Sequence, residues 1–301
     1  MINKNQNTMD MNGDEKRYRK GDCMIQISGV PFQQNENWQI ESIEKTIIQQ
    51  MQNAPVVYSY NSENELLFEL KVRKNIIQSA KEMNKSKAVF TTFAYARCNP
   101  RYWQLTRAGG FLLRPDVRPA DAILDIYRNG SLYAFECATA IPIIYYHAIL
   151  NSIGSYLFNT FFRDLYLYSW HTDTDLGIIT FYSNHFLPGD VLYVNNPDFN
   201  RRTPQFRGVN AVLLDDGKLF GHGFNIRTSE EMLQILNDKR KPDSLQSAYL
   251  TKLVTRPSFK YLFRVASTYR NDRVDKMQRP IVHHNKSSIS YAHYLYYSLF
   301  S

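Results

Sequence analysis

The chain is poor in cysteine, with only Cys23, Cys98 and Cys137 among its 301 residues. Their odd number and wide separation argue against a disulfide framework and favour a reducing environment. The sequence also lacks a CxxC pair and any His/Cys cluster with the spacing of a zinc site. We therefore expect no metal site and no cofactor.

Long hydrophobic runs and nucleic-acid signatures are missing as well. No stretch approaches the roughly 18 apolar residues of a membrane span, and the first 20 residues have no apolar signal-peptide core. The net charge is +8, yet no dense basic run is interleaved with aromatic residues. We expect neither a membrane nor a nucleic acid as partner, and synthesis in the cytoplasm without a signal peptide.

What the chain does contain is enough apolar material for a large core: 44% of its residues are hydrophobic and 14% are aromatic. Polar composition predicts mostly disordered tails at 1–22 and 266–301, the second rich in tyrosine, around one domain at 23–265. Periodicity predicts helices at 63–87, 119–128 and after Thr228, and a further helix at 244–253. Short β-branched or aromatic runs predict strands at 165–170, 177–182, 190–194, 209–214 and 218–221.

The most informative segment runs from Tyr133 to Ala140, where an apolar stretch leads to Glu136 and then Cys137. The apolar residues that follow, to about Ser152, predict a buried helix. A helix N-terminus carries partial positive charge and free N–H groups, which lower a thiol pKa and can hold an oxyanion. Cys137 is therefore a candidate nucleophile, with a buried structural cysteine as the alternative.

Two residues are candidates for the base that such a thiol needs. His222 lies between two glycines near the end of a predicted strand, and Glu136 directly precedes the thiol. For unperturbed groups, proton transfer from the thiol costs about 2.7 kcal/mol to histidine and about 5.7 kcal/mol to glutamate. Glu136 can compete if burial raises its pKa. A cysteine-bearing helix followed by strands is the order of a papain-like core.

The sequence as a whole predicts an α+β fold with a papain-like (NlpC/P60-type) core. Its nucleophile is expected at the N-terminus of a central helix that packs on an antiparallel sheet.

Several segments between about residues 24 and 264 resemble the bacterial spore-coat transglutaminases (protein-glutamine gamma-glutamyltransferases) of the Bacillus type. They are Glu36–Ile40, Leu67–Arg73, Tyr133–Ala140 with Ile143–Tyr146, Tyr168–His171, Asn196–Phe199, Phe206–Asn210 and Leu245–Leu250. The resemblance implies that Cys137 attacks a glutamine carboxamide, releases ammonia and forms a thioester. A lysine amine then gives an ε-(γ-glutamyl)lysine cross-link without calcium.

The resemblance also implies an aromatic tunnel, for which Phe90, Trp170 and Phe206 are the candidate lining residues. Packing in the ordinary core is the alternative for each. Expected partners are glutamine- and lysine-bearing spore-coat proteins, and the expected location is the mother-cell cytoplasm followed by the spore coat. The oligomeric state is not specified by the sequence.

The chain departs from the family pattern at two positions. The family carries a catalytic glutamate in an Arg-Gly-Glu-Asn segment, where this chain has Val209, and Pro142 replaces an ordinary apolar residue. Glu136, helped by His222, is therefore expected to act as base, and the substitution Val209→Glu is expected to raise cross-linking. Two other functions stay open: a cysteine amidase or peptidase with the same core, and a weakly active or inactive coat-binding protein.

Overall fold

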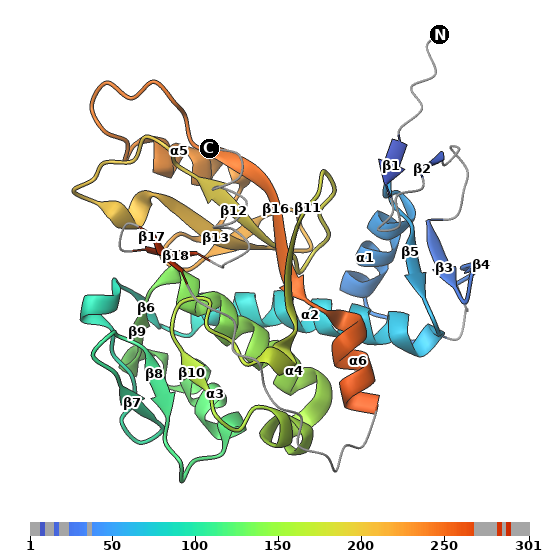
Figure 1. Cartoon of the computed structure of the whole chain (residues 1–301), viewed down its shortest axis with the longest axis horizontal. Coiled ribbons are helices and arrows are strands. Elements are labelled where there is room, and N and C mark those ends of the chain that lie inside the picture. The colour runs from blue at the N-terminus through green and yellow to red at the C-terminus, as the bar shows by residue number, and fades with distance from the viewer. Residues whose placement is uncertain are drawn as a thin grey trace. The chain divides into compact units, whose positions relative to one another are not determined.

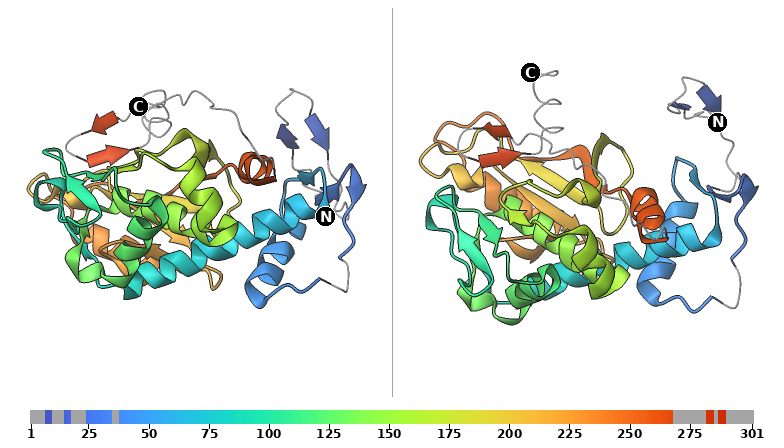
Figure 2. Two further views of the ribbon diagram at one scale, coloured as in Figure 1. Left: turned by 90° about the horizontal axis from the view of Figure 1, so that it is seen from below. Right: turned by 60° about the horizontal axis from the view of Figure 1, so that its bottom comes forward.

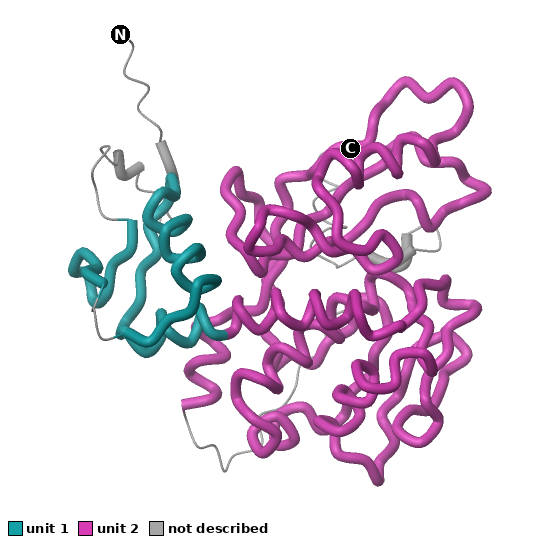
Figure 3. Tube along the Cα trace, turned by 180° about the vertical axis from the view of Figure 1, so that it is seen from behind, with its two compact units in different colours: residues 1–71 teal, residues 72–301 magenta. Residues whose placement is uncertain are grey.

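A computed structural model of the chain describes residues 7–9, 15–17, 24–34, 38–267, 282–284 and 287–289. The Cα trace divides into two compact units, residues 1–71 and 72–301 (Figure 3). The tails predicted at 1–22 and 266–301 lie for the most part outside the described residues. Within those tails the described backbone forms two antiparallel hairpins, whose strands are β1 (Asn7–Met9), β2 (Glu15–Arg17), β17 (Val282–His284) and β18 (Ser287–Ile289).

The first unit contains a small sheet in the order β4-β3-β5 and one complete helix. Its elements are β3 (Ile25–Ile27), β4 (Val30–Pro31), α1 (Ser42–Gln52) and β5 (Tyr58–Tyr60). Ile25, Ile47 and Met51 are buried in its core. The helix α2 (Glu63–Lys85) begins in this unit and ends in the next. It confirms the helix predicted at 63–87.

The second unit is built on a six-stranded antiparallel sheet in the order β11-β16-β12-β13-β14-β15 (Figure 1). The strands are β11 (Ile178–Tyr182), β12 (Val191–Asn195), β13 (Gly208–Leu213), β14 (Leu219–Gly221), β15 (Asn225–Arg227) and β16 (Tyr249–Pro257). Four of them confirm the predicted strands between 177 and 221. Gly217, with φ of 79°, supplies the left-handed turn between β13 and β14.

The prediction of a helix at 244–253 is wrong. Residues from Tyr249 onward form β16, which pairs with both β11 and β12. Thr251, Val254 and Thr255 are β-branched residues that suit a buried central strand, and tertiary pairing decides the outcome.

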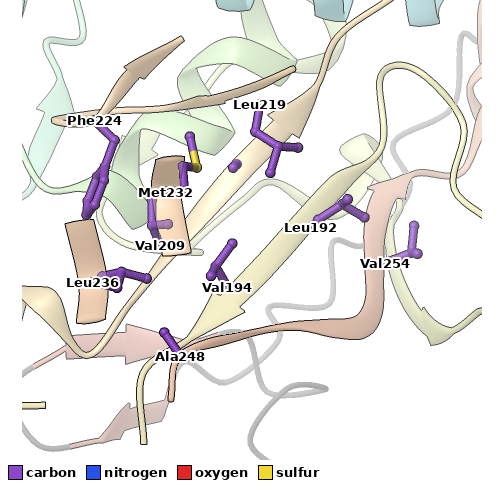
Figure 4. Close-up of a cluster of buried hydrophobic side chains, with 10 residues drawn as sticks. Leu192, Val194, Val209, Leu219, Phe224, Met232, Leu236, Ala248 and Val254 are labelled. Carbon is purple, nitrogen blue, oxygen red and sulfur yellow. The ribbon is translucent and has the colours of Figure 1, made fainter. Parts of the chain in front are cut away.

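Helices lie on both faces of this sheet. The helix α4 (Cys137–Phe161) contacts β13 on one face, and α3 (Pro119–Arg128) packs against α4, as Figure 2 shows. On the other face, α5 (Ser229–Asn237) closes an apolar cluster (Figure 4). Hydrogen bonds from Asn75 to Ser152 (2.8 Å) and between Ser79 and His147 (2.9 Å) fasten α2 to α4.

The central helix α4 is apolar on all sides and buried for almost its whole first half. Pro142 is accommodated within it, and the one residue with non-helical backbone angles is Gly154, with φ of 80°. The helix was predicted to end near Ser152, and its geometry breaks at this glycine. No helix in the described ranges is long and apolar enough to cross a membrane.

The second unit contains further short strands and another helix. They are β6 (Val89–Phe90) paired with β9 (Ala134–Phe135), the sheet of β7 (Trp103–Leu105), β8 (Phe111–Leu113) and β10 (Tyr166–Leu167), and α6 (Phe259–Ser267). The structure thus confirms a mixed α and β fold in which Cys137 begins a buried helix that packs on an antiparallel sheet.

Candidate active site

The chain passes from strand β9 into helix α4 at Glu136, which is the N-cap residue of the helix. Its backbone is extended, with φ of −81° and ψ of 155°, and its carbonyl accepts the first helical hydrogen bonds. Serine, threonine, aspartate and asparagine are the usual residues at this position. The side chain of glutamate is longer than those of these residues, and its carboxylate can fold back onto the first turn of the helix.

The Glu136 carboxylate divides its two oxygens between the helix and the thiol. Oε2 accepts a hydrogen bond of 2.6 Å from the Ala138 N–H, and Oε1 accepts one of 3.0 Å from Cys137 Sγ. Both residues are nearly closed to solvent, with 6% of Glu136 and 5% of Cys137 exposed. The geometry places a carboxylate in direct contact with the candidate nucleophile, where it can accept the thiol proton.

Burial and the neighbouring carboxylate raise the pKa of the Cys137 thiol well above its usual value. The sequence-based expectation of a lowered thiol pKa is therefore wrong. Burial is the main physical reason, and at the helix start the N–H groups of Cys137 and Ala138 are directed at Glu136 instead of the sulfur. Cys137 is consequently a protonated thiol at neutral pH, and it needs a base.

Burial also raises the pKa of Glu136, against the opposing effects of its hydrogen bonds and of the Arg207 charge. The condition under which Glu136 can serve as a base is thus present: its carboxylate is a stronger proton acceptor than a solvated glutamate.

Asn210 on β13 faces the sulfur from the sheet. Its backbone N–H and its side-chain amide both act as donors toward Cys137, and both lower the thiol pKa. The residue is buried, and among the described residues its Oδ1 atom has no hydrogen-bond partner. These donors favour negative charge on sulfur, so Asn210 stabilises the thiolate more than the thiol.

Arg207 and Tyr193 form a second polar layer beside the thiol. Tyr193 is opposite Asn210 in the register of β12 and β13, and Arg207 donates a hydrogen bond to its hydroxyl. Burial and the charges of Cys137 and Glu136 raise the pKa of Tyr193 to about 12. A Cβ atom at Gly208 would collide with the Tyr193 hydroxyl, so glycine is required for this close approach. Tyr193 therefore stays a neutral donor beside the site.

His222 lies in the turn after β14 and makes no hydrogen bond to Cys137 or Glu136 within the described part of the chain. Its ring stacks on Phe135, with centroids 4.5 Å apart, and its Nε2 atom is buried and finds no hydrogen-bond partner in the part of the chain that the structure describes. Burial lowers its pKa to about 4, so the imidazole is neutral at pH 7. Glu136 therefore contacts the thiol directly, whereas His222 packs against Phe135, the residue that precedes Glu136.

Phe90, Trp170 and Phe206, the candidate tunnel residues, lie next to different residues of the candidate active site. Phe90 is half-buried beside His222, with ring centroids 6.1 Å apart. Trp170 follows Ser169, whose N–H donates to the Thr139 hydroxyl in the first turn of α4. Phe206 directly precedes Arg207 and contacts Phe224. Their assignment as tunnel residues stays a prediction.

Val209 lies on the opposite face of β13 from Asn210. It is fully buried in the apolar cluster with Met232 and Leu236 of α5 (Figure 4). Side chains of a strand alternate between faces, so the side chain that turns toward the thiol belongs to residue 210. A carboxylate at position 209 would enter the apolar cluster. This geometry argues against the expectation that Val209→Glu restores a base.

No group of three or more histidine, cysteine, aspartate or glutamate side chains within the described residues has the arrangement of a metal site. The second free cysteine described, Cys98, is half-exposed, and burial raises its pKa to about 11. Cys98 has no carboxylate hydrogen-bonded to its sulfur, whereas Cys137 does.

Sequence reasoning missed Asn210, Arg207 and Tyr193 as site residues. The available signal was strand alternation: a polar residue within the predicted strand 209–214 must face away from its apolar neighbours. Deciding which element that polar face meets required the sheet order, which the sequence does not contain.

The chain is similar to known proteins, and these similarities identify its family. A family model described as protein-glutamine gamma-glutamyltransferase matches residues 24–266. A protein of that name from Halalkalibacterium halodurans is 55% identical over 93% of this chain and 98% of its own length. Another, from Bacillus subtilis, is 43% identical over 80% of this chain and 99% of its own length. A solved transglutaminase from Geobacillus stearothermophilus, without its C-terminal extension, is 48% identical with a TM-score of 0.66 over 69% of this chain and 99% of that one.

These similarities define the class of protein first: the chain is an acyltransferase. More specifically, it belongs to the protein-glutamine gamma-glutamyltransferase family and is a transglutaminase of the bacterial Bacillus type, acting on glutamine and lysine side chains of proteins.

Proposed function

We propose that the reaction runs through a thioester on Cys137, with Glu136 as the proton carrier. The contact that carries this proposal is the 3.0 Å hydrogen bond between Cys137 Sγ and Glu136 Oε1. In the acylation step, sulfur attacks the carboxamide carbon of a glutamine side chain. The thiol proton passes to Glu136 and then to the leaving amine, so that ammonia departs and a thioester remains.

The transfer of the thiol proton to Glu136 depends on how the site changes the difference between the two solution pKa values. For free groups it costs about 5.7 kcal/mol. In this site the transfer moves one negative charge between two atoms that are both buried, so burial disfavours the starting and final states alike. The donors of Asn210 act on the sulfur side and lower the thiol pKa. They supply part of the difference in free energy.

In the second step a lysine amine attacks the thioester carbonyl and forms the ε-(γ-glutamyl)lysine bond. Glu136 takes the amine proton, and the sulfur leaves as a thiolate and is reprotonated. Asn210 and the neutral phenol of Tyr193 are the donors on the sheet side of the developing oxyanion. Water competes for the same thioester, and the nearly closed surroundings of Cys137 disfavour that competition.

We further propose that the core is papain-like (NlpC/P60-type), with the cysteine helix presented to the sheet, and that the reaction needs no calcium. The proposed biological role is cross-linking of glutamine- and lysine-bearing spore-coat proteins, after synthesis in the mother-cell cytoplasm and deposition in the coat. Similarity to the Bacillus-type relatives supports this role. Residues 1–22 and 266–301 are proposed as tails around the catalytic domain at 23–265.

Incorporation of a fluorescent primary amine into a glutamine-rich protein, measured with a calcium chelator present, tests the proposal. The wild-type chain is expected to incorporate the amine, and Cys137→Ala is expected to be inactive. Ammonia release without incorporation would indicate an amidase or peptidase. Neither product would indicate a coat-binding protein. Loss of incorporation on chelation alone would contradict the calcium independence.

A further inference from the structure

A polar cavity of about 640 Å³ opens beside the active site, and Arg207 is part of its wall. The remaining wall comes mainly from Asn195 at the end of β12 and from the segment between β12 and β13, including Asp198, Arg201 and Arg202, with Lys241 from beyond α5. A volume of this size holds one or two amino-acid side chains. Arg207 joins the cavity to the catalytic groups, because its charge acts on Glu136 and it hydrogen-bonds Tyr193.

The charge of this cavity is positive once its internal pairs are counted. Asp198 is the one acidic residue among the lining residues, and Lys241 lies 2.8 Å from its carboxylate. Asp198 also accepts hydrogen bonds from the backbone N–H groups of Leu245 and Gln246. These partners hold its pKa down at about 2. The carboxylate is thus already satisfied within the fold.

Arg201 and Arg202 carry positive charges of the cavity wall that the Asp198–Lys241 pair does not neutralise. Both are exposed, and within the described residues neither guanidinium forms an ion pair with a carboxylate. Two adjacent unpaired arginines beside a cavity attract carboxylates, which arginine binds in bidentate geometry.

The sign of the charge also distinguishes between the two substrates of the proposed reaction. The reactive group of the acyl acceptor is a lysine amine, which is a cation at neutral pH and is repelled by this cavity. The reactive group of the acyl donor is a neutral carboxamide. A positive cavity next to the thiol therefore suits the donor protein and its anionic neighbours.

We propose that this arginine cavity, defined by Arg201, Arg202, Arg207 and the Asp198–Lys241 pair, binds an acidic residue that flanks the reactive glutamine of the acyl-donor protein. The inference rests on the proposed function, and it adds a substrate preference: glutamines in acidic surroundings are selected over glutamines in neutral or basic surroundings.

The test uses three short peptides, each with one glutamine flanked on both sides by glutamates, alanines or lysines, and one fluorescent amine at fixed concentration. The measured quantity is kcat/KM for each peptide at low and high salt, in the full-length chain. We expect the glutamate peptide to exceed the alanine peptide by about 10-fold at low salt, mainly through KM, because surface charge pairs act on encounter and are screened by salt. The lysine peptide is expected to be the poorest.

Arg201→Glu/Arg202→Glu is the diagnostic variant, and Arg101→Glu/Arg107→Glu is its matched control. The control reverses the same number of exposed arginines near β7, on a different sheet. The ratio of kcat/KM for glutamate over alanine peptides should fall below one in the diagnostic variant and stay near the wild-type value in the control.

Equal kcat/KM for the three peptides in the wild-type chain would overturn the proposal, as would a ratio that both variants change equally. Normal incorporation with equal use of the peptides would leave the proposed function standing. Absence of both incorporation and ammonia release with every peptide would instead contradict the proposed function itself.

Discussion

The two faces of strand β13 differ in polarity at two consecutive residues, Val209 and Asn210. Asn210 turns toward the buried thiol with two hydrogen-bond donors, next to Tyr193 on the neighbouring strand. Val209 turns the other way into an apolar cluster with Met232 and Leu236. The amide of Asn210 is stabilised by the negative charge that develops on the Cys137 sulfur. A polar side chain at position 209 would be buried among apolar side chains without a hydrogen-bond partner.

The comparison explains where this site obtains its carboxylate. Position 209 faces apolar side chains, so the acidic group comes from the start of α4, where Glu136 both caps the helix and contacts the thiol. A single carboxylate then performs a structural and a chemical task.

The largest effect is expected from Glu136→Gln. Loss of the base should lower kcat by about 10²- to 10⁴-fold in the amine-incorporation assay. In the wild-type chain the rate should rise with pH through the raised pKa of Glu136, and the variant should lack that limb of the pH profile. Glu82→Gln, at an exposed glutamate, serves as the matched control.

The same variant makes an opposite prediction for stability. The Glu136 pKa is raised in the folded chain, so the protonated form favours folding, and this contribution is lost as pH rises through the folded pKa. Above the folded pKa the buried carboxylate therefore destabilises the fold, and Glu136→Gln should raise Tm in that pH range. A drop in both activity and Tm would indicate that Glu136 is needed for the fold alone.

Val209→Glu tests the apolar face. A charge placed among Met232 and Leu236 should cost on the order of 3 kcal/mol of unfolding free energy, measured by denaturant titration, without raising activity. Val209→Gln separates the effect of charge from that of shape. An increase in amine incorporation would show that residue 209 reaches the thiol, and the assignment of the two faces would then be wrong.

Asn210→Ala removes the side-chain donor on the thiol face. We expect kcat to fall about 10- to 100-fold, in line with a lost hydrogen bond to a charged group, and KM to change little. The rate of Cys137 alkylation by iodoacetamide, followed against pH, should shift to higher pH. Unchanged alkylation would mean that Asn210 does not stabilise the thiolate.

His222→Gln should have the smallest effect on catalysis, about a few-fold at most, because its ring lies against Phe135 and, as far as the described residues show, has no hydrogen bond to the thiol. Its effect should show in acid instead. The folded pKa is lowered from 6.5 to about 4, so stability is present above pH 6.5 and about 3 kcal/mol of it is lost as pH falls through 4. The variant should flatten this part of the Tm profile, whereas a loss of kcat like that of Glu136→Gln would make His222 the base.

Sequence patterns were sufficient for most of the local structure. The helix at 119–128, four strands between 177 and 221 and the helix after Thr228 all follow from periodicity and turn residues, and the structure contains them. The helix prediction for 244–253 failed because the local sequence pattern is ambiguous. Pairing with two neighbouring strands decides the conformation of this segment. The sheet order could not be predicted, since β16 pairs between strands that precede it by more than 50 residues.

At the site, sequence neighbours were predicted and spatial neighbours were missed. Glu136 and Cys137 are adjacent in the chain, and their contact follows from the helix start. Asn210 reaches the same sulfur from a strand more than 70 residues away. The direction of the thiol pKa was also mispredicted, because burial and the Glu136 carboxylate raise it, and the helix-start N–H groups that could have lowered it are directed at Glu136.

The central claim is that Cys137 carries the acyl group in a site whose base is Glu136. The most direct measurement is intact-protein mass spectrometry of the full chain mixed rapidly with a glutamine peptide in the absence of amine. We predict an adduct equal to the peptide mass less ammonia, located on Cys137 by digestion, absent in Cys137→Ala and formed far more slowly in Glu136→Gln. An adduct on another residue, or one that forms equally fast without Glu136, would contradict this mechanism.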